Sequence, residues 1–88
     1  MIGQAGSMIT ETFLKFLCCP EDLSPLANAD EALVERLNAA IARRELRNKA
    51  GRTVENTADG FLVRADGKVA YPIVDQIPVL LIEEGIEL

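Results

Sequence analysis

The clearest pattern of apolar and polar positions lies near the middle of the chain and predicts an amphipathic helix. Apolar residues recur there at intervals of three and four, and they form one stripe: Leu33, Val34, Leu37, Ala40 and Ile41. Polar residues occupy the rest of the helical wheel, and several alanines favour helix strongly. Asn28 to Asp30 suit the start of the helix, and Arg43 with Arg44 suit its last turn. We therefore predict a helix over residues 29–44.

A second, shorter helical pattern precedes this one. Thr10 is a suitable N-cap, and the apolar residues after it follow helical spacing: Phe13, Leu14, Leu17 and Cys18. This pattern predicts a helix over residues 11–18, which Pro20 ends. Residues 1–9 show no such pattern, so we expect a flexible leader there, with Met8 suited to be an alternative start.

From Phe61 onward the pattern changes to an alternation with period two, which is typical of strands. Asp66-Gly67 lies between two alternating runs, residues 62–65 and 68–71. Asp-Gly is favoured in two-residue type I′ turns because both positions need positive φ. The predicted hairpin places Leu62 opposite Tyr71 and Arg64 opposite Val69.

The last third of the chain predicts further strands. Pro72 and Pro78 belong on strand edges or at strand starts, since proline cannot donate to a ladder. Residues 79–82 suit a short buried strand, and residues 85–88 form an acidic tail. The fold class we predict is α+β, with a three- to four-stranded antiparallel sheet, a short N-terminal helix and a longer inserted helix. Residues 10–84 form a single domain in this interpretation.

Composition and charge narrow the possible partners. The formal net charge is −5, which disfavours nucleic-acid binding because that binding relies on Lys and Arg that displace counterions. The basic cluster of residues 43–52 suits the solvated end of a helix. No apolar run approaches the ~20 residues of a membrane span, and no signal peptide is apparent. We expect a cytoplasmic protein that binds neither membrane nor nucleic acid directly.

The residue types that carry most chemistry are scarce. The chain contains no histidine, which removes the commonest general base and the commonest metal ligand. The two cysteines, Cys18 and Cys19, are adjacent rather than spaced as C-x-x-C. Cys18 suits a small buried hydrophobic position, and a catalytic role for Cys19 is the weaker alternative. We therefore predict that the protein is not an enzyme and holds no cofactor.

Two stretches of the sequence contain more specific motifs. Residues 13–26 read F-L-K-F-L-C-C-P-E-D-L-S-P-L, and residues 61–81 read F-L-V-R-A-D-G-K-V-A-Y-P-I-V-D-Q-I-P-V-L-L. They resemble the two ends of the Trm-type methyltransferase-activator family, which includes many small bacterial proteins. That family opens with an apolar helix and C-P-x-C. It closes with a C-x-x-C knuckle, then Y-P-I, an acidic residue, usually glycine, and I-P-x-L-L.

The resemblance also shows which metal ligands this chain lacks. Cys19 stands at the family's first zinc position, Asp22 at the second, Arg64 at the third and Gly67 at the fourth. One thiol, one carboxylate, a cation and a glycine cannot form a tetrahedral zinc site, so we predict no metal. We offer the hypothesis that Asp22 and Arg64 face each other across the former site; the alternative is that both point into water. Gln76 replaces the usual glycine after Asp75.

The resemblance implies a function. Activators of this family perform no chemistry; they pair with a methyltransferase that acts on tRNA, rRNA or a release factor, and a strand of the activator can extend the enzyme's sheet. The candidate partner interface consists of Ile73, Val74, Ile77 and Val79. Ile73 and Val74 are the better candidates, because Ile77, Leu80 and Leu81 also suit the protein's own core. The alternative function is a structural or self-associating interaction module.

Overall fold

One antiparallel sheet organises the chain in the computed structural model, which describes residues 9–88. The predicted leader at residues 1–8 lies outside the described residues. Two helices, five strands and a 3-10 turn follow one another in this order: α1 (Glu11–Leu14), β1 (Leu26–Asn28), α2 (Glu31–Ala42), β2 (Gly60–Arg64), β3 (Val69–Val74), β4 (Ile77–Pro78), η1 (Ile82–Glu84) and β5 (Ile86–Glu87). The predicted α+β class is confirmed. The sheet contains five strands rather than three or four.

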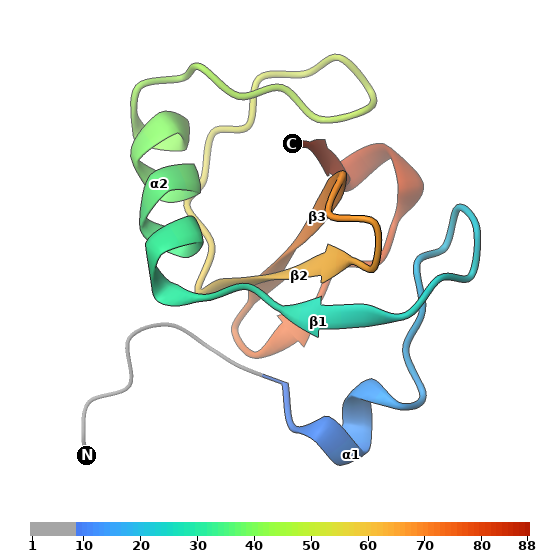
Figure 1. Ribbon diagram of the computed structural model, residues 1–88. Coiled ribbons are helices and arrows are strands. Elements are labelled where there is room, and N and C mark those ends of the chain that lie inside the picture. Colours follow the sequence, from blue (N-terminus) through green and yellow to red (C-terminus); the bar gives the residue numbers. More distant parts are fainter. Residues whose placement is uncertain (1–8) are drawn as a thin grey trace.

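The strands are paired in the order β1-β2-β3-β4, and β5 also pairs with β3 (Figure 1). Every pairing is antiparallel. Leu62 lies opposite Tyr71, which confirms the predicted hairpin register. β3 is therefore the central strand, because three other strands form hydrogen bonds to its two edges.

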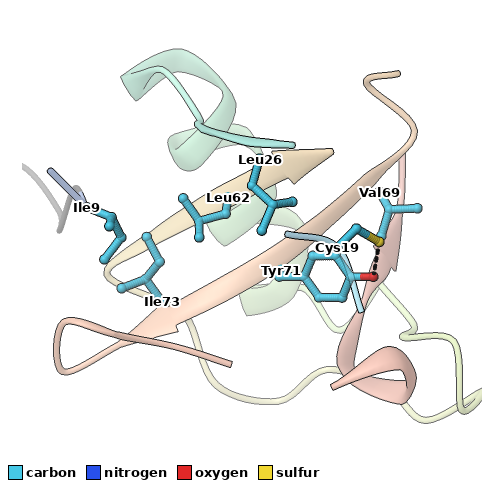
Figure 2. Packing of buried hydrophobic residues seen from close by; sticks show 7 residues of the cluster. All are labelled: Ile9, Cys19, Leu26, Leu62, Val69, Tyr71 and Ile73. Atoms are coloured by element: carbon cyan, nitrogen blue, oxygen red, sulfur yellow. Dashed lines mark hydrogen bonds between the residues drawn. The ribbon is translucent and has the colours of Figure 1, made fainter. Parts of the chain in front are cut away.

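Both faces of the sheet are buried. On one face, α2 contributes Leu37 and Ile41 to a cluster with Phe61, Ala70 and Ile86. On the other, the segment before β1 contributes Ile9 and Cys19 to a cluster with these sheet residues: Leu26, Leu62, Val69, Tyr71 and Ile73 (Figure 2). The alternation of side chains along β2 and β3 supplies one cluster to each face. Ile9, predicted as the end of the leader, is part of this core.

The helix α2 confirms the strongest prediction from the sequence. Its N-cap is Asp30, whose carboxylate accepts a hydrogen bond from the Leu33 N–H at 2.8 Å. Leu37 and Ile41, from the predicted stripe, are its buried residues. The helix ends at Ala42, two residues earlier than predicted, because the chain turns at Arg44 with a φ of 58°.

The helix α1 is shorter than predicted. Thr10 acts as its cap, since the Phe13 N–H donates to Thr10 Oγ1 at 3.3 Å. The prediction of a helix to residue 18 is wrong, because α1 ends at Leu14. Cys18 instead forms an isolated antiparallel bridge with Pro25, which requires extended backbone at that residue.

The turn at Asp66-Gly67 differs in type from the prediction. At Asp66-Gly67 only the glycine has positive φ, 74°, and its N–H donates to the Arg64 carbonyl at 2.7 Å. A type I′ turn needs positive φ at both positions, so the predicted type I′ turn is wrong here. The type I′ pattern occurs instead between β3 and β4, where Asp75 and Gln76 have φ values of 52° and 64°.

The predicted strand at residues 79–82 is also wrong. Residues 79–81 are irregular and residues 82–84 form η1, whereas the supposed tail contains β5, with Ile86 buried. The cause lies in β3, because one of its edges is shared by β4 at Ile73–Val74 and by β5 at Val69–Ala70. The chain between β4 and β5 therefore leaves the sheet after β4 and comes back to the same edge of β3 as β5. Within residues 9–88, no helix has the length and apolar character needed to cross a membrane.

Candidate functional site

Two loops that are far apart in the sequence meet at one end of the sheet. The first, residues 19–24, is a tight turn in which the Leu23 N–H donates to the Cys19 carbonyl and the Cys19 N–H donates to the Ser24 carbonyl, both at 2.8 Å. The second is the turn between β2 and β3, residues 64–68. A hydrogen bond of 3.0 Å from the Ala65 N–H to the Pro25 carbonyl ties the two loops together. We call the residues where they meet the knuckle corner: Cys19, Glu21, Asp22, Arg64 and Asp66.

The inner part of the knuckle corner is a buried pair of polar side chains. Cys19 Sγ lies 3.0 Å from the Tyr71 hydroxyl, and both residues are fully buried (Figure 2). Burial, and next the hydrogen bond with Cys19, raise the pKa of Tyr71 well above its usual value. Tyr71 is therefore a neutral phenol that holds the thiol in place.

Gly85 makes this burial possible. A Cβ atom on Gly85 would lie 3.1 Å from both Tyr71 Cε1 and Val69 Cγ1. Glycine alone therefore lets the C-terminal segment pass so closely over the tyrosine ring. The sequence offers no signal for this role, because the contact joins residues that are distant along the chain.

Arg64 lies at the centre of the outer part of the knuckle corner. Its guanidinium donates from Nε and Nη2 to the two oxygens of Asp66, at 3.0 and 2.9 Å. Nη1 lies 2.9 Å from Glu21 Oε1 and 4.0 Å from Cys19 Sγ. Only 12% of the Arg64 side chain is exposed. The guanidinium thus covers the thiol and links both loops through bidentate and single ion pairs.

A second cation reaches the same corner from the loop after α2. Lys49 Nζ lies 2.6 Å from Glu21 Oε1. This contact lowers the pKa of Glu21 most, and Arg64 lowers it further. Sequence reasoning missed both Glu21 and Lys49, because the two residues are separated by 28 positions.

The remaining carboxylates of the corner are also held in the ionised form. The Ser24 N–H donates to Asp22 Oδ1 at 3.0 Å and lowers the pKa of Asp22 most, while Arg64 contributes less. Arg64 is the main cause of the lowered pKa of Asp66, followed by the Lys68 N–H. Every carboxylate of the corner therefore has a donor that stabilises its charge.

Three of the four positions that the resemblance compares with zinc ligands, Cys19, Asp22 and Arg64, lie close together in the structure. Asp22 and Arg64 face each other, with 3.7 Å between Asp22 Oδ2 and Arg64 Nη1, as one of the two sequence hypotheses predicts. Gly67 supplies the positive φ of the second turn. Within residues 9–88 no group of three or more His, Cys, Asp or Glu side chains is arranged to hold a metal ion. A zinc site offers several thiolates to the metal ion. Here a single thiol lies beside the positively charged guanidinium of Arg64, which repels a cation.

The predicted partner interface is partly revised. Ile73 is fully buried in the core, so its selection as an interface candidate is wrong. Its side chain points to the inner face of β3, whereas that of Val74 points outward and is 44% exposed. Ile77 was a candidate interface residue that, like Leu81, also suited the core; the two side chains are 65% and 55% exposed. Val79 is half-buried.

Two further exposed apolar side chains belong to the N-terminal part. Phe16 is 80% exposed and Leu23 is 73% exposed. Phe16 follows the early end of α1, and Leu23 is held at a φ of 64° in the first knuckle loop. The helical pattern had placed Phe13 and its neighbours on one continuous helix, so it gave no indication of this exposure.

Comparisons with known proteins give one informative match. A scan against models of protein families and a search of curated proteins found no match. Among solved structures, the solution NMR structure of XF2673 from Xylella fastidiosa, a Northeast Structural Genomics Consortium target, superimposes with a TM-score of 0.71. The two sequences are 32% identical over 90% of this chain and 81% of that chain. This chain belongs to the same protein family as XF2673.

Proposed function

We propose that this protein is a non-catalytic accessory subunit that binds and activates a methyltransferase of the translation apparatus. The observation that supports the proposal most is the meeting of residues 13–26 with residues 61–81. These segments resemble the two halves of the Trm-type activators, and here they join through the pairing of β1 with β2 and through Cys19 and Tyr71. Such a partner enzyme works in the cytoplasm, which we propose as the compartment.

A role without chemistry agrees with the state of the reactive groups. The Cys19 thiol is fully buried against Tyr71 and covered by Arg64. A nucleophilic thiol needs access and a thiolate-stabilising environment at a surface cleft. The carboxylates nearby are engaged by Arg64 and Lys49, which leaves them poorly suited to move protons.

An exposed apolar surface at the other end of β3 is where we place the partner. We call it the apolar tip; it comprises Val74 and Ile77, which lie opposite each other across the β3–β4 turn and are both exposed. β4 contains Pro78, which has no N–H to donate to an added strand. We therefore expect contact through side chains at the apolar tip rather than through extension of the sheet at β4.

The test is a purification of the tagged protein from its native cell, with the co-eluting protein assayed for methyl transfer from labelled S-adenosylmethionine. Candidate acceptors are tRNA, rRNA and a release factor. We expect Ile77→Asp to lose both the partner and the methyl transfer. The matched control is Leu88→Asp, because Leu88 is also half exposed but lies beside Lys68, at the opposite end of β3.

Three results would contradict the proposal. The first is a lone monomer in every purification, and the second is equal binding by Ile77→Asp and Leu88→Asp. The third is a size in solution that grows with concentration and falls in Ile77→Asp, which would support the alternative of a self-associating module.

A further inference from the structure

A groove with an apolar floor runs along the outer side of α2. It lies between the helix and the segment that leads into β2, and its volume is about 560 Å³. The apolar residues that line it, which we call its floor, are Val34, Ala39 and Ala58. Figure 1 shows this segment passing beside α2 before it enters the sheet.

A pair of hydrogen bonds between α2 and the segment before β2 fixes the width of the groove. The Asn38 side-chain amide donates to the Ala58 carbonyl at 2.9 Å, and its oxygen accepts from the Ala58 N–H at 3.0 Å. This clamp fixes the distance between α2 and the neighbouring segment. Because Ala39 and Ala58 are small, the space between the two elements stays unfilled.

The rim of the groove carries only negative charge. Glu31, Glu35 and Asp59 line it, and no Lys or Arg does. Within residues 9–88, none of these three carboxylates takes part in an ion pair, in contrast to those at the knuckle corner. Residues 53–63 and 69–88, which include the segment beside the groove, contain no Lys or Arg at all.

We propose that this groove binds a lysine- or arginine-bearing segment of a protein partner. The long aliphatic stem of such a side chain covers apolar surface while its charged end reaches carboxylates, which matches a floor of small apolar residues beneath an acidic rim. Asp59 also connects the groove to the apolar tip, since its Oδ2 accepts from the Asp75 N–H at 2.7 Å. The inference does not depend on the partner being a methyltransferase.

The experiment is an NMR titration of the full, isotope-labelled chain with a blocked five-residue alanine peptide that contains one arginine and one lysine. The control peptide has norleucine and glutamine at those positions. We expect saturable shifts of the amides of Val34, Ala39 and Ala58, and a dissociation constant at least about fivefold lower for the basic peptide. Shifts spread equally over Glu21, Asp66 and Glu83 would overturn the proposal, as would equal affinities for the two peptides.

Substitutions on exposed positions separate the rim from the floor. Glu35→Gln removes one rim charge, and Ala39→Leu fills the groove. Each substitution is expected to weaken binding of the basic peptide by at least about fivefold. Glu83→Gln is the matched control, because Glu83 is exposed but does not line the groove, so binding should be unchanged. Equal weakening by all three, or concentration-dependent self-association that Glu35→Gln abolishes, would contradict a protein partner of this kind.

Discussion

The Cys19 thiol and the Tyr71 hydroxyl lie 3.0 Å apart in the core although 52 positions separate them in the sequence. Cys19 belongs to the first knuckle loop, and Tyr71 belongs to β3, the central strand of the sheet. Neither residue is exposed to solvent. The pair therefore anchors the N-terminal segment directly onto the sheet, and disruption of one partner leaves the other without its polar contact.

Tyr71 is expected to resist ionisation until the protein unfolds. Its pKa is raised, chiefly by burial, so the folded state keeps a proton that an unfolded chain releases near pH ~10. The contribution of neutral Tyr71 to the free energy of unfolding is therefore fully present below about pH 10 and is lost progressively above it. Tyr71 is the single tyrosine of the chain, so phenolate absorbance reports it alone. The absorbance should rise together with the loss of circular dichroism.

The control for this titration is Cys19→Ala. The substitution removes a contact that raises the Tyr71 pKa and opens a small cavity, with an expected loss of about 1–3 kcal/mol in unfolding free energy. Phenolate should then form at lower pH than in the unaltered protein. A smooth titration near pH ~10 with unchanged circular dichroism would show that Tyr71 is accessible to solvent.

Arg64 supplies the positive charge that joins the two knuckle loops. Its guanidinium meets Glu21 and Asp22 on the first loop and Asp66 on the second. A planar cation with several fixed donors can make such contacts at once, which a single ammonium cannot do.

The cover that Arg64 forms over Cys19 leads to a prediction about thiol reactivity. In a Cys18→Ser background, Arg64→Ala should raise the rate at which a thiol reagent modifies Cys19, on the order of tenfold, because local opening becomes easier. The rate for Arg64→Lys should fall between the rate of the parent protein and that of Arg64→Ala, since lysine keeps the charge without the bidentate contact. The measurement is the rate of colour release by an aromatic disulfide. Equal rates in all three proteins would mean that Arg64 does not shield the thiol.

The loss of stability at low pH should also depend on Arg64. The pKa values of Glu21, Asp22 and Asp66 are lowered, so their contribution is present above about pH 4 and is lost as pH falls through the lowered values. Arg64→Gln removes the main cause of the shift at Asp66 and weakens that at Glu21. Between pH ~5 and ~2 the urea midpoint should therefore fall less steeply in this variant.

A matched substitution distinguishes this effect from a simple change in net charge. Arg36→Gln removes one exposed positive charge from α2, away from the knuckle corner. Its acid limb should keep the slope of the unaltered protein. If Arg36→Gln and Arg64→Gln flatten the curve equally, the ion pairs of the corner do not control the acid response.

The features predicted correctly from the sequence are those that depend on residues close together in the chain. The apolar stripe of α2 and the Leu62–Tyr71 register each follow from a periodicity that one element carries by itself. The Asp22–Arg64 contact was accessible only as one of two hypotheses, and only through the resemblance to a knuckle.

The features that were missed depend on packing between distant segments. Val79–Ile82 has the composition of a strand, but the edge of β3 that it would need is shared by β4 and β5. The Lys49–Glu21 contact and the close passage of Gly85 over Tyr71 likewise arise only once the loops are in place. In each case tertiary context decides among local options that the sequence leaves equal.

The last prediction concerns the strained turn between β3 and β4. Gln76 has a φ of 64°, in the left-handed region that costs a residue with a Cβ roughly 1–2 kcal/mol and costs glycine little. Gln76→Gly should therefore stabilise the protein by about 1 kcal/mol and raise the midpoint of thermal unfolding by about 4–8 °C. Gly67→Ala is the reciprocal test, because Gly67 has a φ of 74° with no atom within 4 Å of an added Cβ, so its cost would come from the backbone alone. Opposite shifts of similar size would support this account, whereas destabilisation by Gln76→Gly would show that the glutamine side chain stabilises the turn.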